Sequence, residues 1–100
     1  MNTKTKEYLR KLRGDSLTFG QMIESLRKSD EISQITLARK VRISRAHLCD
    51  IEKGRRTVTI GRAAQLAKVM GYSVNQFIAL ALENELRNAG YRVRVHLEAA

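Results

Sequence analysis

The sequence predicts a single all-α domain of five short helices, followed by one C-terminal β-strand. Two observations carry this prediction. Helix-capping residues with apolar neighbours recur along a chain that has no proline. The spacing of apolar residues changes from a helical period to simple alternation only after Gly90. A chain of 100 residues has room for one core, and its 43% of apolar residues can fill that core.

The first two predicted helices begin at caps of the same kind. Thr18 opens a helix over about residues 18–29, and Gln21 lies three residues on, where its side chain can reach back to the cap. Ser33 opens a second, shorter helix in the same way. These caps are expected because the first amides of a helix have no partner within the helix.

Three further caps open the remaining helices: Ser44, Thr59 and Ser73. Glycines suited to helix ends follow the three helices: Gly54, Gly71 and Gly90. The fifth helix is expected to continue to about Asn88.

The chain beyond Gly90 alternates apolar and charged residues from Tyr91 to Leu97, which predicts a β-strand. A lone strand leaves its backbone groups unpaired, and the fifth helix carries a wider apolar arc than one core can cover. Both features predict a homodimer whose strands pair across a two-fold axis. The alternatives are a strand from a partner protein and a disordered tail. The expected dimerisation residues are Phe77, Leu80, Leu82, Leu86, Tyr91, Val93, Val95 and Leu97.

Positive charge is concentrated in the middle of the chain. There are 19 Lys and Arg residues against 10 Asp and Glu residues, a formal net charge of +9. Residues 33–68 hold nine of the basic and two of the acidic residues. Such an excess favours a polyanionic partner, and nucleic acid first. Residues 1–13 are also basic and are expected to form an N-terminal arm or helix, or a frayed terminus, before a domain over residues 14–89 and the strand over residues 90–100.

Other classes of function receive little support from the sequence. The longest apolar run is six residues, Phe77 to Leu82, whereas about 20 are needed to span a bilayer. No signal peptide is apparent and Cys49 is the one cysteine, so a cytoplasmic protein without an internal disulfide is expected. No catalytic constellation or metal-binding cluster is visible, and we expect neither enzyme activity nor a metal or cofactor. RNA is less expected than duplex DNA, because aromatic stacking platforms are lacking.

Two short helices joined by a three-residue turn lie in the most basic third of the chain, as in a helix-turn-helix. Three stretches carry a more specific pattern: Ser33-Gln34-x-x-Leu37-Ala38-x-x-Val41, Ile43-Ser44-x-x-x-Leu48 and Ile51-Glu52-x-Gly54-Arg55-Arg56. Over about residues 20–78 the chain resembles the Xre family of helix-turn-helix repressors, related to phage repressors and Cro proteins. Arg42 departs from the family, which usually has glycine in this turn. The resemblance implies a repressor-like helix-turn-helix fold.

The resemblance also implies roles for individual residues. Base contacts are expected from outward positions of the recognition helix: Arg45, Ala46, His47 and Asp50. Gln34 is expected to hold a backbone phosphate at the start of the preceding helix. Further phosphate contacts are expected at the two ends of the recognition helix, from Ser44, Lys53, Arg55, Arg56 and Thr57. Arg27 and Glu52 are expected to form a structural ion pair between the first helix and the recognition helix.

Alternatives stay open at four of these positions. Gln34 could instead be a solvated side chain without a ligand. Arg45 could instead contact phosphate alone. Asp50 has the alternative of pairing with Lys53, three residues on. His47 is either a phosphate donor that gains charge near its reference pKa of about 6.5 or an exposed histidine without a special role.

By this resemblance the chain is a sequence-specific, double-stranded DNA-binding transcriptional repressor that occupies an operator overlapping a promoter. Compact members of the family are often antitoxins that repress their own operon, phage-type switches, or controllers of restriction systems. The basic strand favours an antitoxin with a cognate toxin partner. The alternative is a protein-interaction module or coactivator with a helix-turn-helix fold that does not read DNA.

Overall fold

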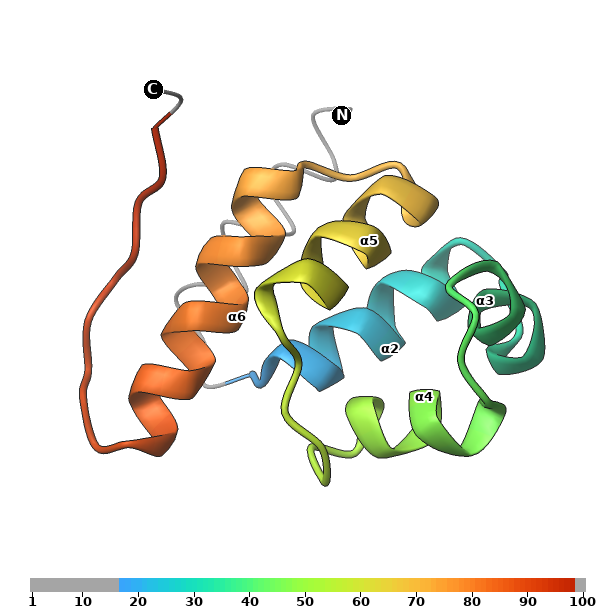
Figure 1. Ribbon diagram of the computed structural model, residues 1–100, viewed down its shortest axis with the longest axis horizontal. Coiled ribbons are helices and arrows are strands. Elements are labelled where there is room, and N and C mark those ends of the chain that lie inside the picture. Colours follow the sequence, from blue (N-terminus) through green and yellow to red (C-terminus); the bar gives the residue numbers. More distant parts are fainter. Residues whose placement is uncertain (1–16, 99–100) are drawn as a thin grey trace.

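A computed structural model describes residues 17–98 of the chain. The basic arm predicted at residues 1–13 lies outside the described residues. Within them the chain forms five α-helices, in the order shown in Figure 1. Their bounds are Phe19–Ser29 for α2, Gln34–Lys40 for α3, Arg45–Glu52 for α4, Ile60–Met70 for α5 and Val74–Asn88 for α6. The five helices predicted from the sequence are therefore confirmed.

Each helix begins directly after its predicted cap. The side-chain oxygen of every cap accepts a hydrogen bond from the backbone amide three residues on: Thr18, Ser33, Ser44, Thr59 and Ser73. At Thr18 the exchange is reciprocal, because its own amide donates to Oε1 of Gln21 at 2.9 Å. Helix α5 ends at Gly71, whose φ of 81° lies in the left-handed region that glycine adopts without a steric penalty.

Helix α2 lies between two pairs of helices (Figure 1). Helices α5 and α6 pack on each other and α6 also contacts α2, while α3 packs on α4, and α4 contacts α2. The core between them is aliphatic apart from two rings, and its largest fully buried side chains include Met22, Ile23, Leu37, Leu48, Leu66 and Phe77. The helix-turn-helix is thus one side of a packed domain and not an isolated pair of helices.

Phe77 belongs to this core. Its side chain is 0% exposed. The ring meets Phe19 edge-on, with centroids 5.9 Å apart, and stacks on Tyr72 at 5.7 Å. This placement corrects the assignment of Phe77 to a dimer surface, because a ring enclosed by its own chain has no face left for a second protomer. Part of the wide apolar arc of α6 is therefore covered within the chain.

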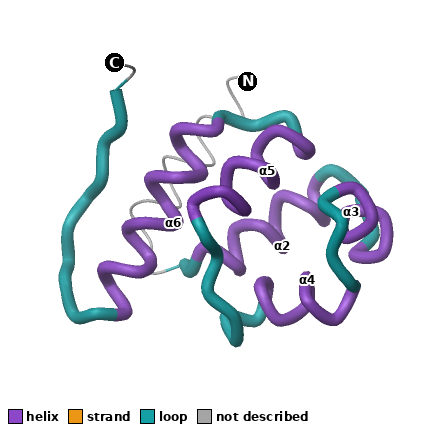
Figure 2. The backbone as a smooth tube through the Cα atoms, viewed as in Figure 1, coloured by secondary structure: helices purple, strands orange, loops and turns teal. Residues whose placement is uncertain are grey.

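The predicted C-terminal strand is not formed within residues 17–98. After Gly90 the chain turns back and runs as an extended segment along α6, drawn as a loop in Figure 2. The amide of Val95 donates to Oε1 of Glu83 at 2.7 Å, which fastens the segment to α6. Tyr91 and Val93 are 61% and 51% exposed. A ladder is missing because the described residues provide no second strand with which the segment can pair.

Candidate nucleic-acid interface

The turn between α3 and α4 sets the angle of the helix-turn-helix. The amide of Ile43 donates to the carbonyl oxygen of Ala38 at 3.0 Å, so the turn folds back on the end of α3. Arg42, which stands where the Xre family usually has glycine, has a φ of 59°. Left-handed backbone costs a residue with a Cβ about 1–2 kcal/mol, so this arginine is held in place by the surrounding structure.

Helix α5 supports the same turn from outside. Nη1 of Arg62 and Nε2 of Gln65 both donate to the carbonyl oxygen of Val41, each at 3.1 Å. Nη1 of Arg62 also donates to Oε1 of Gln65 at 2.6 Å. The carbonyl oxygen at the end of α3 therefore accepts hydrogen bonds from side chains of α5, which follows α4 in the sequence. Sequence reasoning missed this contact, because neither side chain stands out by type or spacing.

A buried ion pair ties α4 to α2. Nε and Nη2 of Arg27 lie 2.7 and 3.1 Å from the two carboxylate oxygens of Glu52. A further donation from Nη1 of Arg27 to the carbonyl oxygen of Ile32 measures 2.8 Å. The two side chains are 9% and 0% exposed. A bidentate contact of this kind fixes orientation as well as distance, so the end of α4 has one position relative to α2.

Gln34 joins this pair from α3. Its Nε2 donates to Oε1 of Glu52 at 2.9 Å, and the side chain is half-buried. The first residue of α3 is thereby held to the last residue of α4. Sequence reasoning assigned Gln34 to phosphate and did not foresee this partner, which lies 18 residues along the chain. The second hydrogen of the amide nitrogen stays available to a phosphate.

Helices α2 and α4 approach each other closely at Gly20. A Cβ at this position would collide with the carbonyl oxygen of Ile51 and lie 2.8 Å from that of Glu52. The last turn of the recognition helix therefore rests on the backbone of α2. Only glycine permits this approach.

The outer face of α4 begins with Arg45 and Ala46, both exposed. Its inner face holds Leu48 and Ile51 in the core. Among the described residues Arg45 has no hydrogen-bond or ion-pair partner. Oγ of Ser44 accepts from the amide of His47 at 3.0 Å, so its hydroxyl hydrogen is left to donate. The amino end of α4 thus presents donors and a small apolar side chain to solvent.

The ion pairs at the far end of α4 differ from the Asp50–Lys53 pair that was one alternative from the sequence. Nε of Arg55 donates to Oδ1 of Asp50 at 3.0 Å, and this hydrogen bond raises the pKa of Arg55. Nζ of Lys53 lies 3.7 Å from Oε2 of Glu24. Asp50 is therefore paired with Arg55 and not with Lys53. All four side chains of these two ion pairs are at least partly exposed. Either pair can therefore be exchanged for contacts with DNA at a small cost in free energy.

His47 faces the loop after α4. Its Nε2 lies 3.5 Å from Nη1 of Arg56. Partial desolvation, followed by the charges of Arg56 and Arg62, lowers the pKa of His47, against a smaller opposing effect of Asp50. The neutral form of the ring is thus favoured in the free protein. Arg56 and Thr57 are exposed beside it.

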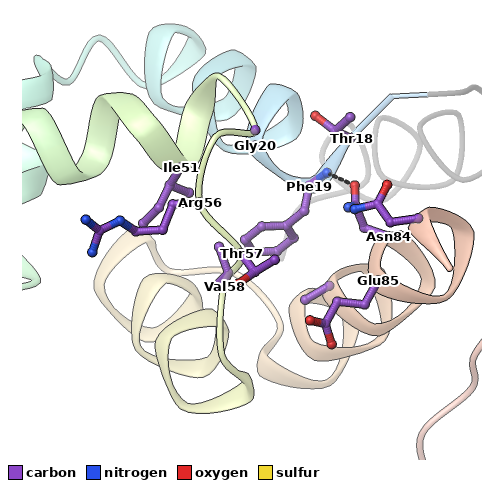
Figure 3. Close-up of a pocket in the computed structure, with 12 residues that line it drawn as sticks. Thr18, Phe19, Gly20, Ile51, Arg56, Thr57, Val58, Asn84 and Glu85 are labelled. Carbon is purple, nitrogen blue, oxygen red and sulfur yellow. Dashed lines mark hydrogen bonds between the residues drawn. The ribbon is translucent and has the colours of Figure 1, made fainter.

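Figure 3 shows a pocket of about 110 Å³ behind this loop, between the start of α2 and the face of α6. The amide of Phe19 donates to Oδ1 of Asn84 at 2.8 Å across one side of it. An α6 side chain therefore satisfies the first amide of α2, a contact with no signal in the sequence. The guanidinium of Arg56 extends away from this pocket, toward the outer side of the loop (Figure 3).

Two other kinds of feature are missing from residues 17–98. No helix in residues 17–98 is long and apolar enough to cross a membrane. In the same part of the chain, no three His, Cys, Asp or Glu side chains are grouped so that they can hold a metal ion.

Comparison with known proteins agrees with this geometry. A helix-turn-helix family model matches residues 23–77, from α2 to the first part of α6. The immunity repressor protein of Bacillus phage phi105 is 32% identical over 62 residues, which are 62% of this chain and 43% of that protein. The chain thus spans less than half the length of this curated relative. No solved structure gives a significant match.

Proposed function

The chain belongs to the helix-turn-helix family, in its Xre-type branch, and on that premise we propose that it is a sequence-specific, double-stranded DNA-binding transcriptional repressor. The observation that carries the proposal is the outer face of α4. Arg45 is exposed and unpartnered there among the described residues, on a helix fixed by Gly20 and by the Arg27–Glu52 pair. A recognition helix held in this way enters the major groove without first having to order itself.

Base contacts fall to the outer face of α4. Arg45 donates two hydrogen bonds to a guanine edge, and Ala46 leaves space for a thymine methyl group. Asp50 accepts from cytosine only when it releases Arg55. The backbone is held by the side chains around the two ends of α4 and at the start of α3: Gln34, Ser44, Lys53, Arg55, Arg56 and Thr57.

We propose that two copies of the chain bind paired half-sites. One recognition helix covers only a few base pairs, and the two-fold symmetry of a dimer doubles the site. The exposed apolar side chains of the tail support this arrangement: Tyr91, Val93 and Leu97. Leu80, Leu82 and Leu86 are half-buried on α6, and Val95 is half-buried beside them. Pairing of the two tails, antiparallel across the axis, would supply the ladder that is missing within residues 17–98.

We further propose that the chain represses its own promoter. The relative named an immunity repressor supports repression over activation. The antitoxin role rests on the family resemblance and on the basic tail, and implies a toxin encoded beside this gene. Growth with the adjacent reading frame expressed alone or together with this chain tests that role. We propose that the chain acts by binding and not by catalysis.

An electrophoretic mobility shift with the upstream region of the chain's own gene tests the proposal. We expect a complex that survives competition by random duplex and is dissociated by salt and heparin. Footprinting then locates two protected half-sites about one helical turn apart. Absence of salt-sensitive binding to any duplex would favour a protein-interaction module instead.

A further inference from the structure

A second, open pocket of about 250 Å³ lies between α4, the loop after it and the start of α5. Its polar lining consists of His47, Arg56, Thr57, Thr59 and Arg62. None of the described residues that line it is acidic. It opens beside the recognition helix, on the side toward which Arg56 extends. Two guanidinium groups and an imidazole therefore share one concave surface that has no carboxylate among its described lining residues.

Arg62 is held in place before any ligand arrives, and Arg56 contacts His47. Arg62 is fixed by its hydrogen bonds to Val41 and Gln65, which use one terminal nitrogen and leave the other groups of the guanidinium without a partner among the described residues. Nη1 of Arg56 lies 3.5 Å from Nε2 of His47. A neutral imidazole accepts at this nitrogen when its proton is on Nδ1, whereas a protonated ring cannot.

Desolvation and the charged groups around His47 explain the direction of its pKa shift in the free protein. Arg56 of the loop and Arg62 of α5 face the ring and, after desolvation, lower its pKa. Asp50, on α4 itself, raises it by less. A phosphodiester placed between the two arginines carries one negative charge, which offsets part of their effect on the ring and can accept a hydrogen bond from it, so it would raise the pKa of His47.

We propose that this pocket binds one backbone phosphate of duplex DNA between His47, Arg56 and Arg62, and that His47 takes up a proton from solvent as the phosphate enters. Nε2 of His47 then changes from acceptor to donor, and both it and Arg56 donate to phosphate oxygens. The inference rests on the proposed DNA binding. It adds Arg62 to the interface and moves His47 from base contact to phosphate contact.

A dependence of DNA affinity on pH follows from this proton uptake. The complex holds one more proton than the free protein and DNA, so lowering the pH favours the complex. The DNA affinity rises as the pH falls from the pKa of His47 in the complex to its lower pKa in the free protein. Below the pKa of the free protein the affinity no longer changes with this proton. Its slope is at most about tenfold per pH unit for one proton.

The experiment is fluorescence anisotropy with a labelled 30-bp random-sequence duplex (about three helical turns), at pH 5.5, 6.5 and 7.5 and constant ionic strength. The full-length wild type is compared with His47→Gln and with the matched control His96→Gln, which removes the other histidine, on the exposed tail. Circular dichroism at each pH verifies that all three proteins are folded. We expect the affinity of the wild type and of His96→Gln to rise as the pH falls, and a flatter profile for His47→Gln.

Parallel profiles for the wild type and His47→Gln would overturn the inference while leaving the proposed function intact. No binding of any protein at low salt would overturn both. A second arm follows the His47 imidazole by NMR with the duplex, with sodium sulfate and with sodium chloride at equal ionic strength. A rise of its pKa with the duplex supports the site. A rise with sulfate alone would assign the pocket to a free oxyanion and overturn the DNA assignment.

Discussion

The arginines around the recognition helix differ in what holds them. Arg27 is bound to Glu52 and Arg55 to Asp50, whereas Arg45 has no partner among the described residues. A contact from Arg45 to a base therefore breaks nothing within the protein. Removing its side chain changes only what it does with DNA, which makes it the cleanest residue on this surface to test.

Arg45→Ala is expected to relax sequence specificity. Loss of a bidentate guanine contact removes roughly 1–3 kcal/mol of discrimination at one base-pair position. The free energy of unfolding is expected to stay within about 0.5 kcal/mol, since the side chain is exposed. Titration of the operator, of its single-position variants and of random duplex measures the effect. Equal weakening on operator and random DNA would mean that Arg45 contacts phosphate alone.

At the scale of the element, α4 depends on two contacts with α2 that differ in kind. Gly20 sets how closely the two helices approach, and the Arg27–Glu52 pair sets their relative orientation. Both contacts involve the last two residues of α4, Ile51 and Glu52, at the other end of the helix from Arg45. Disturbing either one should therefore alter DNA binding although neither substitution replaces a residue proposed to contact DNA.

Gly20→Ala is expected to lower the free energy of unfolding by about 1–3 kcal/mol, because the new methyl group meets backbone carbonyls that cannot move independently. Gly61→Ala is the matched control in α5. A Cβ there has one neighbour, Oγ1 of Thr59 at 4.0 Å, so the same change should be neutral or stabilising by up to about 1 kcal/mol. Chemical denaturation measures both. Equal effects of the two substitutions would exclude a steric role for Gly20.

Glu52→Gln is expected to cost about 3–5 kcal/mol of unfolding free energy, because it leaves the Arg27 guanidinium buried without a counter-charge. The double variant Arg27→Met/Glu52→Met should recover most of this loss, since a buried pair can be replaced by apolar side chains at little net cost. Denaturation curves and DNA affinity are measured on both proteins. A single variant as stable as the wild type would show that the pair is solvated in solution.

Among the features of the domain as a whole, the tail is the one on which the proposed dimer depends. It runs along α6 with Tyr91, Val93 and Leu97 exposed, and the amide of Val95 is its described attachment to Glu83. Exposed apolar side chains on an extended segment favour association. A dimer built through the tails leaves the α4 face of each protomer open to DNA.

Truncation after Gly90 is expected to give monomers in analytical ultracentrifugation and to abolish cooperative operator binding. Val93→Lys tests the same idea without removing the Val95–Glu83 contact, because the Val93 side chain is half exposed and its replacement should leave the protomer folded. Both variants are expected to weaken dimerisation. Dimers that persist in both proteins would exclude the tail as the interface and point to α6 alone.

The helices were predictable from the sequence because their determinants are local. A cap such as Thr18 bonds to an amide three residues away, and the partner is present whatever the rest of the chain does. The family could also be recognised from the sequence, because its motif from Ser33 to Arg56 is one continuous stretch. The orientation of α6 was not accessible, because Phe77 and Leu80 are both apolar and only packing distinguishes the enclosed side chain from the half-buried one.

The start and end of each helix and the location of the basic surface can be read from the sequence, since both depend on neighbours in the chain. The pairing of polar and charged side chains cannot be read in this way and emerges only when the chain is folded. Asp50 pairs with Arg55 and not with Lys53, and Gln34 donates a hydrogen bond to Glu52. His47 lines the same pocket as Arg56 and Arg62. The physical reason is that electrostatic and hydrogen-bonding partners are selected by distance in space, and the packing of α2, α4 and α5 sets that distance.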